Sequence, residues 1–146
     1  MDRSFRPKTG RFGIMPVTVS APLGTLTANN TTTIVIPTPP GKLYIGRVCV
    51  HQKTLVADAD GTVLATLIKR RASDDQDVSL TTAVSLEVDV QVAAERGNLS
   101  FLSTLGDKDR ILISGDTLEF DVVNNSAAID TQPVGAFVVV ELFYLE

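Results

Sequence analysis

The stretch ISGDTLEFDVVNN, residues 113–125, alternates between apolar and polar side chains with a period of two residues. One parity is apolar and consists of Leu118, Phe120 and Val122, whereas the other contains Thr117, Glu119 and Asp121. Successive side chains of a β-strand point to opposite faces, so we expect the apolar set to face a core and both acids to face solvent. Two catalytic carboxylates would instead have to share one pocket in different environments. The stretch therefore predicts a half-buried strand.

Similar short runs recur along the chain and are separated by turn residues. The expected strands cover residues 15–19, 31–36, 43–52, 62–69, 84–92, 99–105, 117–123 and 134–145. A chain of 146 residues is long enough for one domain with its own core. The pattern predicts an all-β, single-domain antiparallel β-sandwich, and among such folds we expect the eight-stranded jelly roll.

The last run, VGAFVVVELFYL at residues 134–145, differs from the others because both of its faces are apolar. One face is expected to join the core formed by the first stretch, and it consists of Val138, Val140 and Leu142. The opposite face carries Phe137, Val139 and Phe143. Only one face of a sandwich strand can point into the core, so either an overlying loop or a neighbouring subunit must cover the second set. We expect a subunit contact around a threefold axis.

The first 13 residues form a basic segment that is distinct from the expected domain at residues 14–146. Its basic and aromatic residues are Arg3, Phe5, Arg6, Lys8, Arg11 and Phe12. Interspersed proline and glycine disfavour an amphipathic helix, so an extended arm is expected. Residues 111–146 contain no lysine or arginine, and this acidic end is a candidate surface for the arm of a neighbouring copy. The alternative is a solvated tail.

Composition excludes several classes of protein. The net charge of −4 and the pI near 4.9 disfavour binding to nucleic acid through phosphate neutralisation. The single cysteine, Cys49, cannot form an internal disulfide, so synthesis in a reducing cytoplasm fits. Neither an export signal nor a membrane span is expected, because no apolar segment follows the basic arm and Glu141 interrupts the most apolar run.

The only thiol and the only imidazole of the chain, Cys49 and His51, are two residues apart on one expected strand. Same-face neighbours on a strand have Cα atoms about 6.5–7 Å apart, which predicts poor geometry for a nucleophile and its base. A zinc site would need about two further ligands. A small buried thiol beside a strand-face histidine is therefore expected, with no catalytic, metal or cofactor site.

The segment ADADGT places Asp58, Asp60 and Gly61 in an order that begins some calcium loops. An EF-hand loop requires a bidentate glutamate at its twelfth position, and here that position is Lys69. An Asp-Gly pair between two apolar runs is typical of a hairpin turn, so we expect a turn that joins residues 43–56 to residues 62–69.

The segment KRRASDDQD, residues 69–77, changes sign of charge half-way along. We expect a solvated loop whose charges pair with one another. A contact between subunits is the alternative.

Taken together, several segments resemble the small decoration, or cement, proteins of tailed-bacteriophage heads. The resemblance lies in the arm RSFRPKTGRF, the turn-rich TLTANNTTTIVIPTPPGKLYIGRV, the turn segment ADADGTVLATLIKR and the closing pair GDTLEFDVVNNS and VGAFVVVELFYLE. It implies a non-enzymatic jelly-roll homotrimer that is located in the virion. It also implies that the major capsid protein, or another virion subunit, is the partner.

Two other functions remain open. A receptor- or carbohydrate-binding module of a phage tail or fibre would share the fold, but such sites usually need exposed aromatic residues in loops. Tyr44 and Tyr144 are the only tyrosines, tryptophan is absent, and both tyrosines fall in expected strands. A hydrolase is the more distant alternative.

Overall fold

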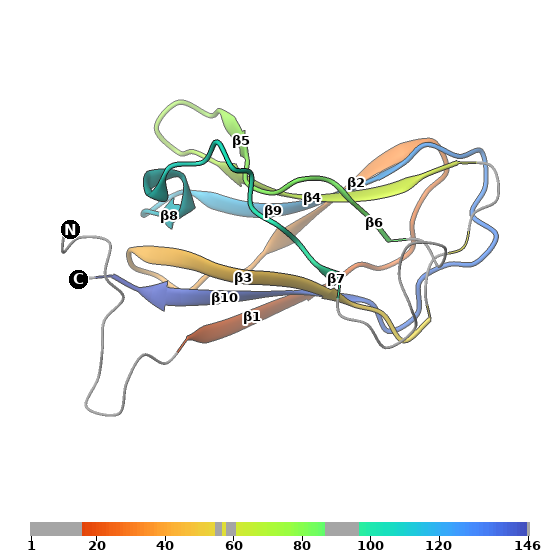
Figure 1. Cartoon of the computed structure of the whole chain (residues 1–146), viewed down its shortest axis with the longest axis horizontal. Coiled ribbons are helices and arrows are strands. Elements are labelled where there is room, and N and C mark those ends of the chain that lie inside the picture. The colour runs from red at the N-terminus through yellow and green to blue at the C-terminus, as the bar shows by residue number, and fades with distance from the viewer. Residues whose placement is uncertain (1–15, 55–56, 58–60, 87–96, 146) are drawn as a thin grey trace.

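The computed structural model describes residues 16–54, 57, 61–86 and 97–145. These residues form ten strands and one short 3₁₀ helix (Figure 1). The first five strands are β1 (Val17–Pro22), β2 (Asn30–Ile36), β3 (Leu43–His51), β4 (Val63–Arg70) and β5 (Asp77–Ser79). They are followed by β6 (Val84–Ser85), β7 (Gly97–Asn98), the 3₁₀ helix η2 (Asp107–Arg110), β8 (Ile111–Leu112), β9 (Thr117–Asn124) and β10 (Phe137–Tyr144).

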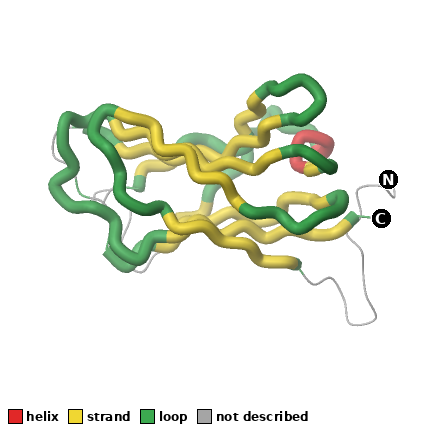
Figure 2. Tube along the Cα trace, turned by 180° about the vertical axis from the view of Figure 1, so that it is seen from behind, coloured by secondary structure: helices red, strands yellow, loops and turns green. Residues whose placement is uncertain are grey.

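The strands form two antiparallel sheets that pack face to face (Figures 1 and 2). The first sheet has the order β1-β10-β3-β7, and β8 also pairs with β3. The second has the order β2-β9-β4-β5, and β6 also pairs with β4. Apart from β4 with β5 and β6, neighbouring strands are distant in sequence. The expected all-β antiparallel sandwich is confirmed.

The order of the strands is that of a jelly roll. Strands β5 and β6 pair with successive parts of β4, and strands β7 and β8 pair with opposite ends of β3. Each of these pairs therefore acts as one interrupted edge strand, which reduces the ten strands to eight. Counted in this way, the sheets have the orders 1-8-3-6 and 2-7-4-5, which is the jelly-roll arrangement of two Greek keys.

The two interrupted edge strands close one side of the sandwich. The Leu102 amide donates to the Leu80 carbonyl at 3.0 Å, and the Thr82 amide donates to the Ser100 carbonyl at 2.9 Å. Residues 99–105 are expected to form a strand. In the structure, their backbone hydrogen-bonds to residues 80–82, which belong to the edge of the other sheet, and this segment therefore links the two sheets. Of the expected strand 84–92, β6 covers only the start, and residues 87–96 lie outside the described residues.

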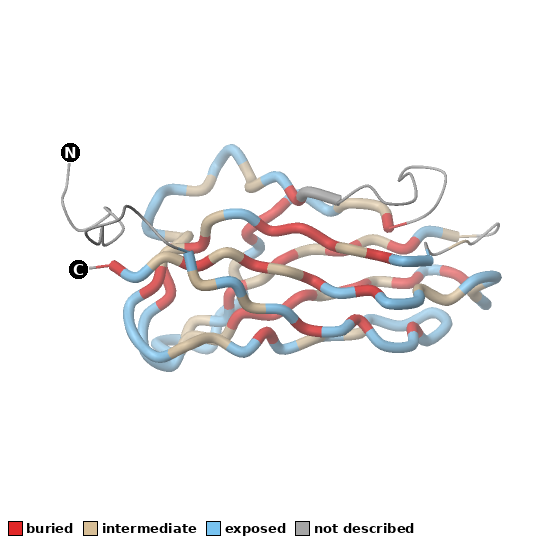
Figure 3. Tube along the Cα trace, turned by 90° about the horizontal axis from the view of Figure 1, so that it is seen from below, coloured by how far each residue is buried: buried red, intermediate tan, exposed pale blue. Residues whose placement is uncertain are grey.

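The core lies between the inner faces of the sheets, and buried positions alternate with less buried ones along β4 and β10 (Figure 3). Its largest fully buried side chain is Phe120 of β9. All six expected core residues are 0% exposed, namely Leu118, Phe120, Val122, Val138, Val140 and Leu142. The core expected from alternation alone is confirmed.

The hairpin expected at the Asp-Gly pair is wrong. Strands β3 and β4 lie in different sheets, so the connection between them crosses from one layer to the other. Part of this connection pairs with a later loop: the amides of Lys53 and Thr54 both donate to the Val134 carbonyl at 3.0 Å. The hairpin signal failed because each strand finds its partners elsewhere, β3 beside β10 and β4 beside β9.

We predict that Phe120→Ala lowers the free energy of unfolding by about 3–5 kcal/mol, because it leaves a cavity among side chains that are fully buried. The matched control is Val35→Ala on the outside of the sandwich, where Val35 is 59% exposed and about 0.5 kcal/mol or less is expected. Urea unfolding followed by circular dichroism measures both. Equal losses in the two variants would contradict this placement of the core.

Candidate functional site

The sandwich has two outer faces, and their chemistry differs. We call the outer side of β1, β10 and β3 the β10 face. By alternation and register it consists of Thr18, Ser20, Tyr44, Gly46, Arg47, Cys49, His51, Phe137, Val139, Glu141 and Phe143. All three residues expected to form a subunit contact thus lie together on this face. Phe137 is 43% exposed, and Val139 and Phe143 are half-buried.

Register sets the neighbours of these apolar side chains. Phe137 lies opposite His51, Val139 lies opposite Cys49, and Phe143 lies opposite Tyr44. A bulge in β3 places Glu141 opposite Gly46 and Arg47. A Cβ atom at Gly46 would collide with the Phe143 ring, so glycine is what allows this ring to lie against the strand.

Arg110 of η2 holds the bulge of β3 in place. Its Nε and Nη2 atoms donate to the Ile45 carbonyl at 3.0 and 2.8 Å, and Nη2 also donates to the Gly46 carbonyl at 3.0 Å. Its guanidinium carbon lies 3.9 Å from the centroid of the Phe101 ring and 4.7 Å from that of the Tyr44 ring. These contacts satisfy bulge carbonyls and stack a cation on aromatic rings, so Arg110 stabilises this end of the β10 face.

A shallow depression extends the apolar surface beyond Phe137. It has a volume of about 340 Å³ and is lined by Pro22, Gly24, Thr25, Pro133, Val134, Gly135, Ala136 and Phe137. Val134 is 52% exposed. Exposed apolar side chains therefore continue from the β10 face around the start of β10.

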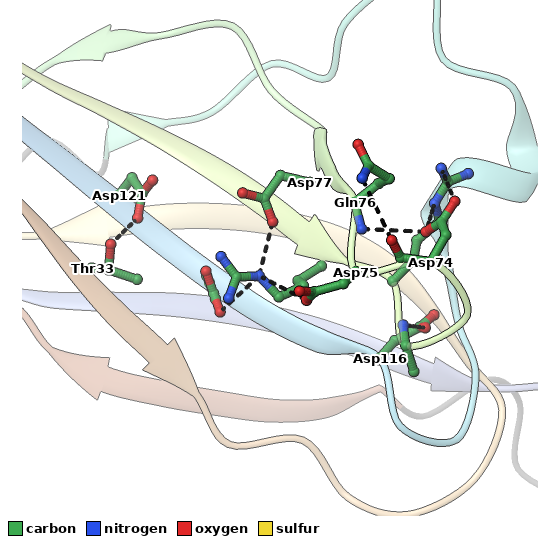
Figure 4. Close-up of polar contacts among 11 residues, drawn as sticks. Thr33, Asp74, Asp75, Gln76, Asp77, Asp116 and Asp121 are labelled. Carbon is green, nitrogen blue, oxygen red and sulfur yellow. Dashed lines mark hydrogen bonds and ion pairs between the residues drawn. The ribbon is translucent and has the colours of Figure 1, made fainter.

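We call the outer side of β2, β9 and β4 the β9 face. It carries Thr31, Thr33, Val35, Leu64, Thr66, Ile68, Arg70, Glu119, Asp121 and Val123. Its polar groups bond to one another (Figure 4). The Thr33 hydroxyl donates to Asp121 at 2.6 Å, and Arg70 Nε donates to Asp77 at 3.0 Å and lies 3.9 Å from Glu119.

The structure agrees only in part with the expectation that Glu119 and Asp121 both face solvent. Both point away from the core, as alternation predicts, but only Asp121 is partly exposed. Glu119 is 8% exposed, so the expectation that both are well solvated is wrong for this residue. Neighbouring side chains, including that of Arg70, cover its carboxylate.

The expected internal pairing of charges in residues 69–77 is confirmed. Arg71 donates to both carboxylate oxygens of Asp74, at 3.1 and 2.6 Å. The hydrogen bond from Arg70 to Asp77, followed by the charge of Asp77, raises the pKa of Arg70 above its usual value. Asp116 accepts a hydrogen bond from the amide of Ala72 at 3.0 Å, and this bond connects the loop after β4 to the residue that precedes β9.

Lys69 departs from this pattern because it points inward. Its residue is 4% exposed, and its Nζ atom donates to the Ile111 carbonyl at 3.2 Å. Burial lowers the pKa of Lys69 below its ordinary value, and the charges of Asp116 and Asp109 partly oppose this shift. The local signal for it is the parity that Lys69 shares with Val63, Ala65 and Leu67, but lysine normally marks the solvent side of a strand.

Cys49 and His51 are closer than strand spacing predicts. The Sγ atom of Cys49 lies 3.3 Å from Nε2 of His51, within reach of a hydrogen bond. The prediction of poor geometry is wrong, because the two side chains lean toward each other along the strand. Within the described residues, no group of three or more histidine, cysteine, aspartate or glutamate side chains could hold a metal ion.

The predicted arm residues, Arg3, Phe5, Arg6, Lys8, Arg11 and Phe12, lie outside the described residues. The acidic residues expected to receive such an arm are dispersed rather than gathered. Asp116 lies in a turn, Glu119 and Asp121 lie on the β9 face, and Glu141 lies on the β10 face. The described part of the C-terminal quarter therefore has no single acidic surface.

Comparisons with protein-family models, with curated proteins and with solved structures gave no match. Among the described residues, no helix has the length and apolar character needed to cross a bilayer.

We predict that the free energy of unfolding rises with pH in the alkaline range through Lys69. Because its folded-state pKa is lowered from 10.5, the unfolded chain binds more protons than the folded chain between the lowered value and 10.5. Stability therefore increases as pH rises through that window and levels off above it. Urea midpoints measured across the range should show this rise in the natural chain.

Lys69→Met should remove this part of the rise, whereas the exposed Lys108→Met should retain it. If the urea midpoints of the natural chain and Lys69→Met changed with pH in parallel, the burial of the Lys69 amine would be contradicted.

Proposed function

We propose that this chain is a non-enzymatic structural protein of a virion that binds and stabilises a capsid lattice, with the β10 face as the contact between copies of a homotrimer. The observation that carries the proposal is the apolar outer side of β10, a strand in the interior of its sheet. Its inner side chains are fully buried, and its outer ones include Phe137 at 43% exposure. Contiguous exposed apolar side chains on a folded domain are typical of interaction surfaces.

The two outer faces differ in a way that favours the β10 face for association. Thr33, Asp121, Arg70 and Asp77 on or beside the β9 face already satisfy one another. On the β10 face, the apolar side chains of Phe137, Val139 and Phe143 lie on either side of Glu141, which is opposite Arg47 on the neighbouring strand. A surface with apolar side chains and charges of both signs can be complementary to a second copy of itself.

Attachment to a shell would draw on many weak contacts at once. Copies repeated on a symmetric lattice bind with high avidity even when each contact is weak. A basic arm that orders on docking loses about 2–5 kcal/mol or more of its gross interaction energy. Its four positive charges and two phenylalanines could offset this cost through charge-assisted hydrogen bonds and apolar contacts with a capsid protein.

We predict that the double variant Phe137→Ser/Val139→Thr dissociates the trimer, because it removes apolar area from the proposed contact without touching the inner side of β10. Light scattering coupled to size-exclusion chromatography at micromolar concentration measures the mass. The matched control is Val35→Ser on the β9 face, which should keep the mass of the natural chain. A natural chain that is monomeric under these conditions would overturn the proposed assembly.

We predict that deletion of residues 1–13 leaves the β-sandwich folded, since β1 begins at Val17, but weakens attachment to virus particles. Added salt should weaken attachment of the full chain in the same direction, because screening acts on the charges of the arm. The measurement is co-sedimentation with particles from the cells that produce this protein, at increasing sodium chloride concentration.

A variant with Arg3, Arg6, Lys8 and Arg11 changed to glutamine separates the effect of charge from that of chain length. Full occupancy by the truncated protein, with unchanged resistance to salt, would show that the arm is dispensable. Binding of the full chain to a glycan array, without binding to particles, would favour the alternative of a carbohydrate-binding module.

A further inference from the structure

The β10 face contains a contact that the proposed function does not use. Cys49 and His51 are alternate residues of β3, and Sγ of Cys49 lies 3.3 Å from Nε2 of His51. The chain has one cysteine and one histidine, so its only thiol and its only imidazole are in contact. Cys49 is buried at 8% exposure and His51 is half-buried. Register places both on the outer side of the sheet, and Cys49 is not a member of the core cluster between the sheets.

We propose that His51 activates the Cys49 thiol, which makes Cys49 a site of covalent modification by soft electrophiles that approach the β10 face. The thiolate, not the thiol, is the reactive form of cysteine. A base within hydrogen-bond reach supplies that form by accepting the proton. This inference rests on the geometry of β3 and concerns the chain whose β10 face is not covered by a second copy.

The reaction with a simple alkylating agent is balanced as follows. The proton of the Cys49 thiol moves to Nε2 of His51, which leaves a thiolate beside an imidazolium. The sulfur attacks the methylene carbon of iodoacetamide, so a carbon–sulfur bond forms while the carbon–iodine bond breaks and iodide leaves. The imidazolium then releases its proton to solvent, and no oxidant or reductant is required.

Charged groups of both signs accompany the pair on its face. Arg47 on β3 would favour a thiolate, and Glu141 on β10, two residues beyond the Val139 that lies opposite Cys49, would oppose it. On the other side, β7 pairs with Cys49 and Val50 through Asn98 and Gly97, which carry no charge. His51 is a titratable group in contact with the sulfur.

A nucleophile–base assignment fits this pair better than a metal site. A structural zinc ion needs about four ligands, whereas proton transfer needs only two atoms at hydrogen-bond distance. Within the described part of the chain, no histidine, cysteine or carboxylate side chain joins Cys49 and His51 as a third metal ligand.

The test is the rate of iodoacetamide labelling of the full chain as a function of pH, followed by intact mass, at a dilution at which light scattering shows the monomer, so that a second copy does not cover the β10 face. With one cysteine, a single added carbamidomethyl group reports Cys49, and Cys49→Ser should take up none. At neutral pH, we expect the natural chain to react about tenfold faster than His51→Gln, because the thiolate fraction of Cys49 should be about ten times larger in the natural chain. The labelling rate of the natural chain should reach half of its maximum at a pH below about 8.5, which is the pKa typical of an ordinary thiol. For His51→Gln, the pH of half-maximal rate should lie closer to that pKa.

The control is Glu141→Gln, which changes a charge on the same face without touching the thiol–imidazole contact and should affect the rate less than His51→Gln. Should His51→Gln fail to fold, the ring-proton resonances of the single histidine in the natural chain provide a second measurement. They should shift when Cys49 is labelled, because the contact is broken. Superimposable profiles, an unchanged histidine spectrum, or a folded chain that labels only after unfolding in urea would each overturn the proposal.

Discussion

The apolar layer between the two sheets is the constraint on which the rest of this structure depends. Strands β9 and β10 lie in the interior of their sheets, and each contributes three side chains that are 0% exposed. Burial of one large apolar side chain stabilises a fold by about 1.5–3 kcal/mol, so a slip of one residue in either strand would expose an entire apolar set. The shared core therefore fixes which side of every neighbouring strand remains available at the surface.

This constraint gives the two outer faces different characters. On the β9 face, Thr33 hydrogen-bonds to Asp121 and Arg70 hydrogen-bonds to Asp77, so these polar side chains already have partners within the chain. On the β10 face, apolar side chains remain at the surface although the fold does not need them there. The β9 face also carries an exposed apolar side chain, that of Val35, which is 59% exposed. We assign association to the β10 face because its exposed apolar side chains continue from Phe137 to Val134.

The same face shows how a local motif acquires chemistry from its surroundings. Arg110 holds the bulge that shifts the register between β3 and β10, and the residues beyond the bulge, Cys49 and His51, face outward with their side chains in contact. A thiol on the outer side of a sheet, with a base beside it, lies closer to an incoming molecule than a thiol between the sheets would. Association through this face would cover the pair, so labelling and assembly are expected to compete.

The sequence by itself determined the class of the fold and the division of each strand into two faces, because alternation with a period of two is local. This is why residues 117–123 and 134–145 predicted the core members in β9 and β10 correctly, and why Phe137, Val139 and Phe143 were expected outside it. Only the tertiary structure decided which strands are neighbours. The Asp60-Gly61 turn signal suggested a hairpin, yet β3 and β4 belong to different sheets, because pairing is settled by long-range burial rather than by the turn. Tertiary packing also decided the burial of Lys69 and Glu119 and the 3.3 Å contact of Cys49 with His51, since these depend on side-chain direction and on neighbours that are remote in sequence.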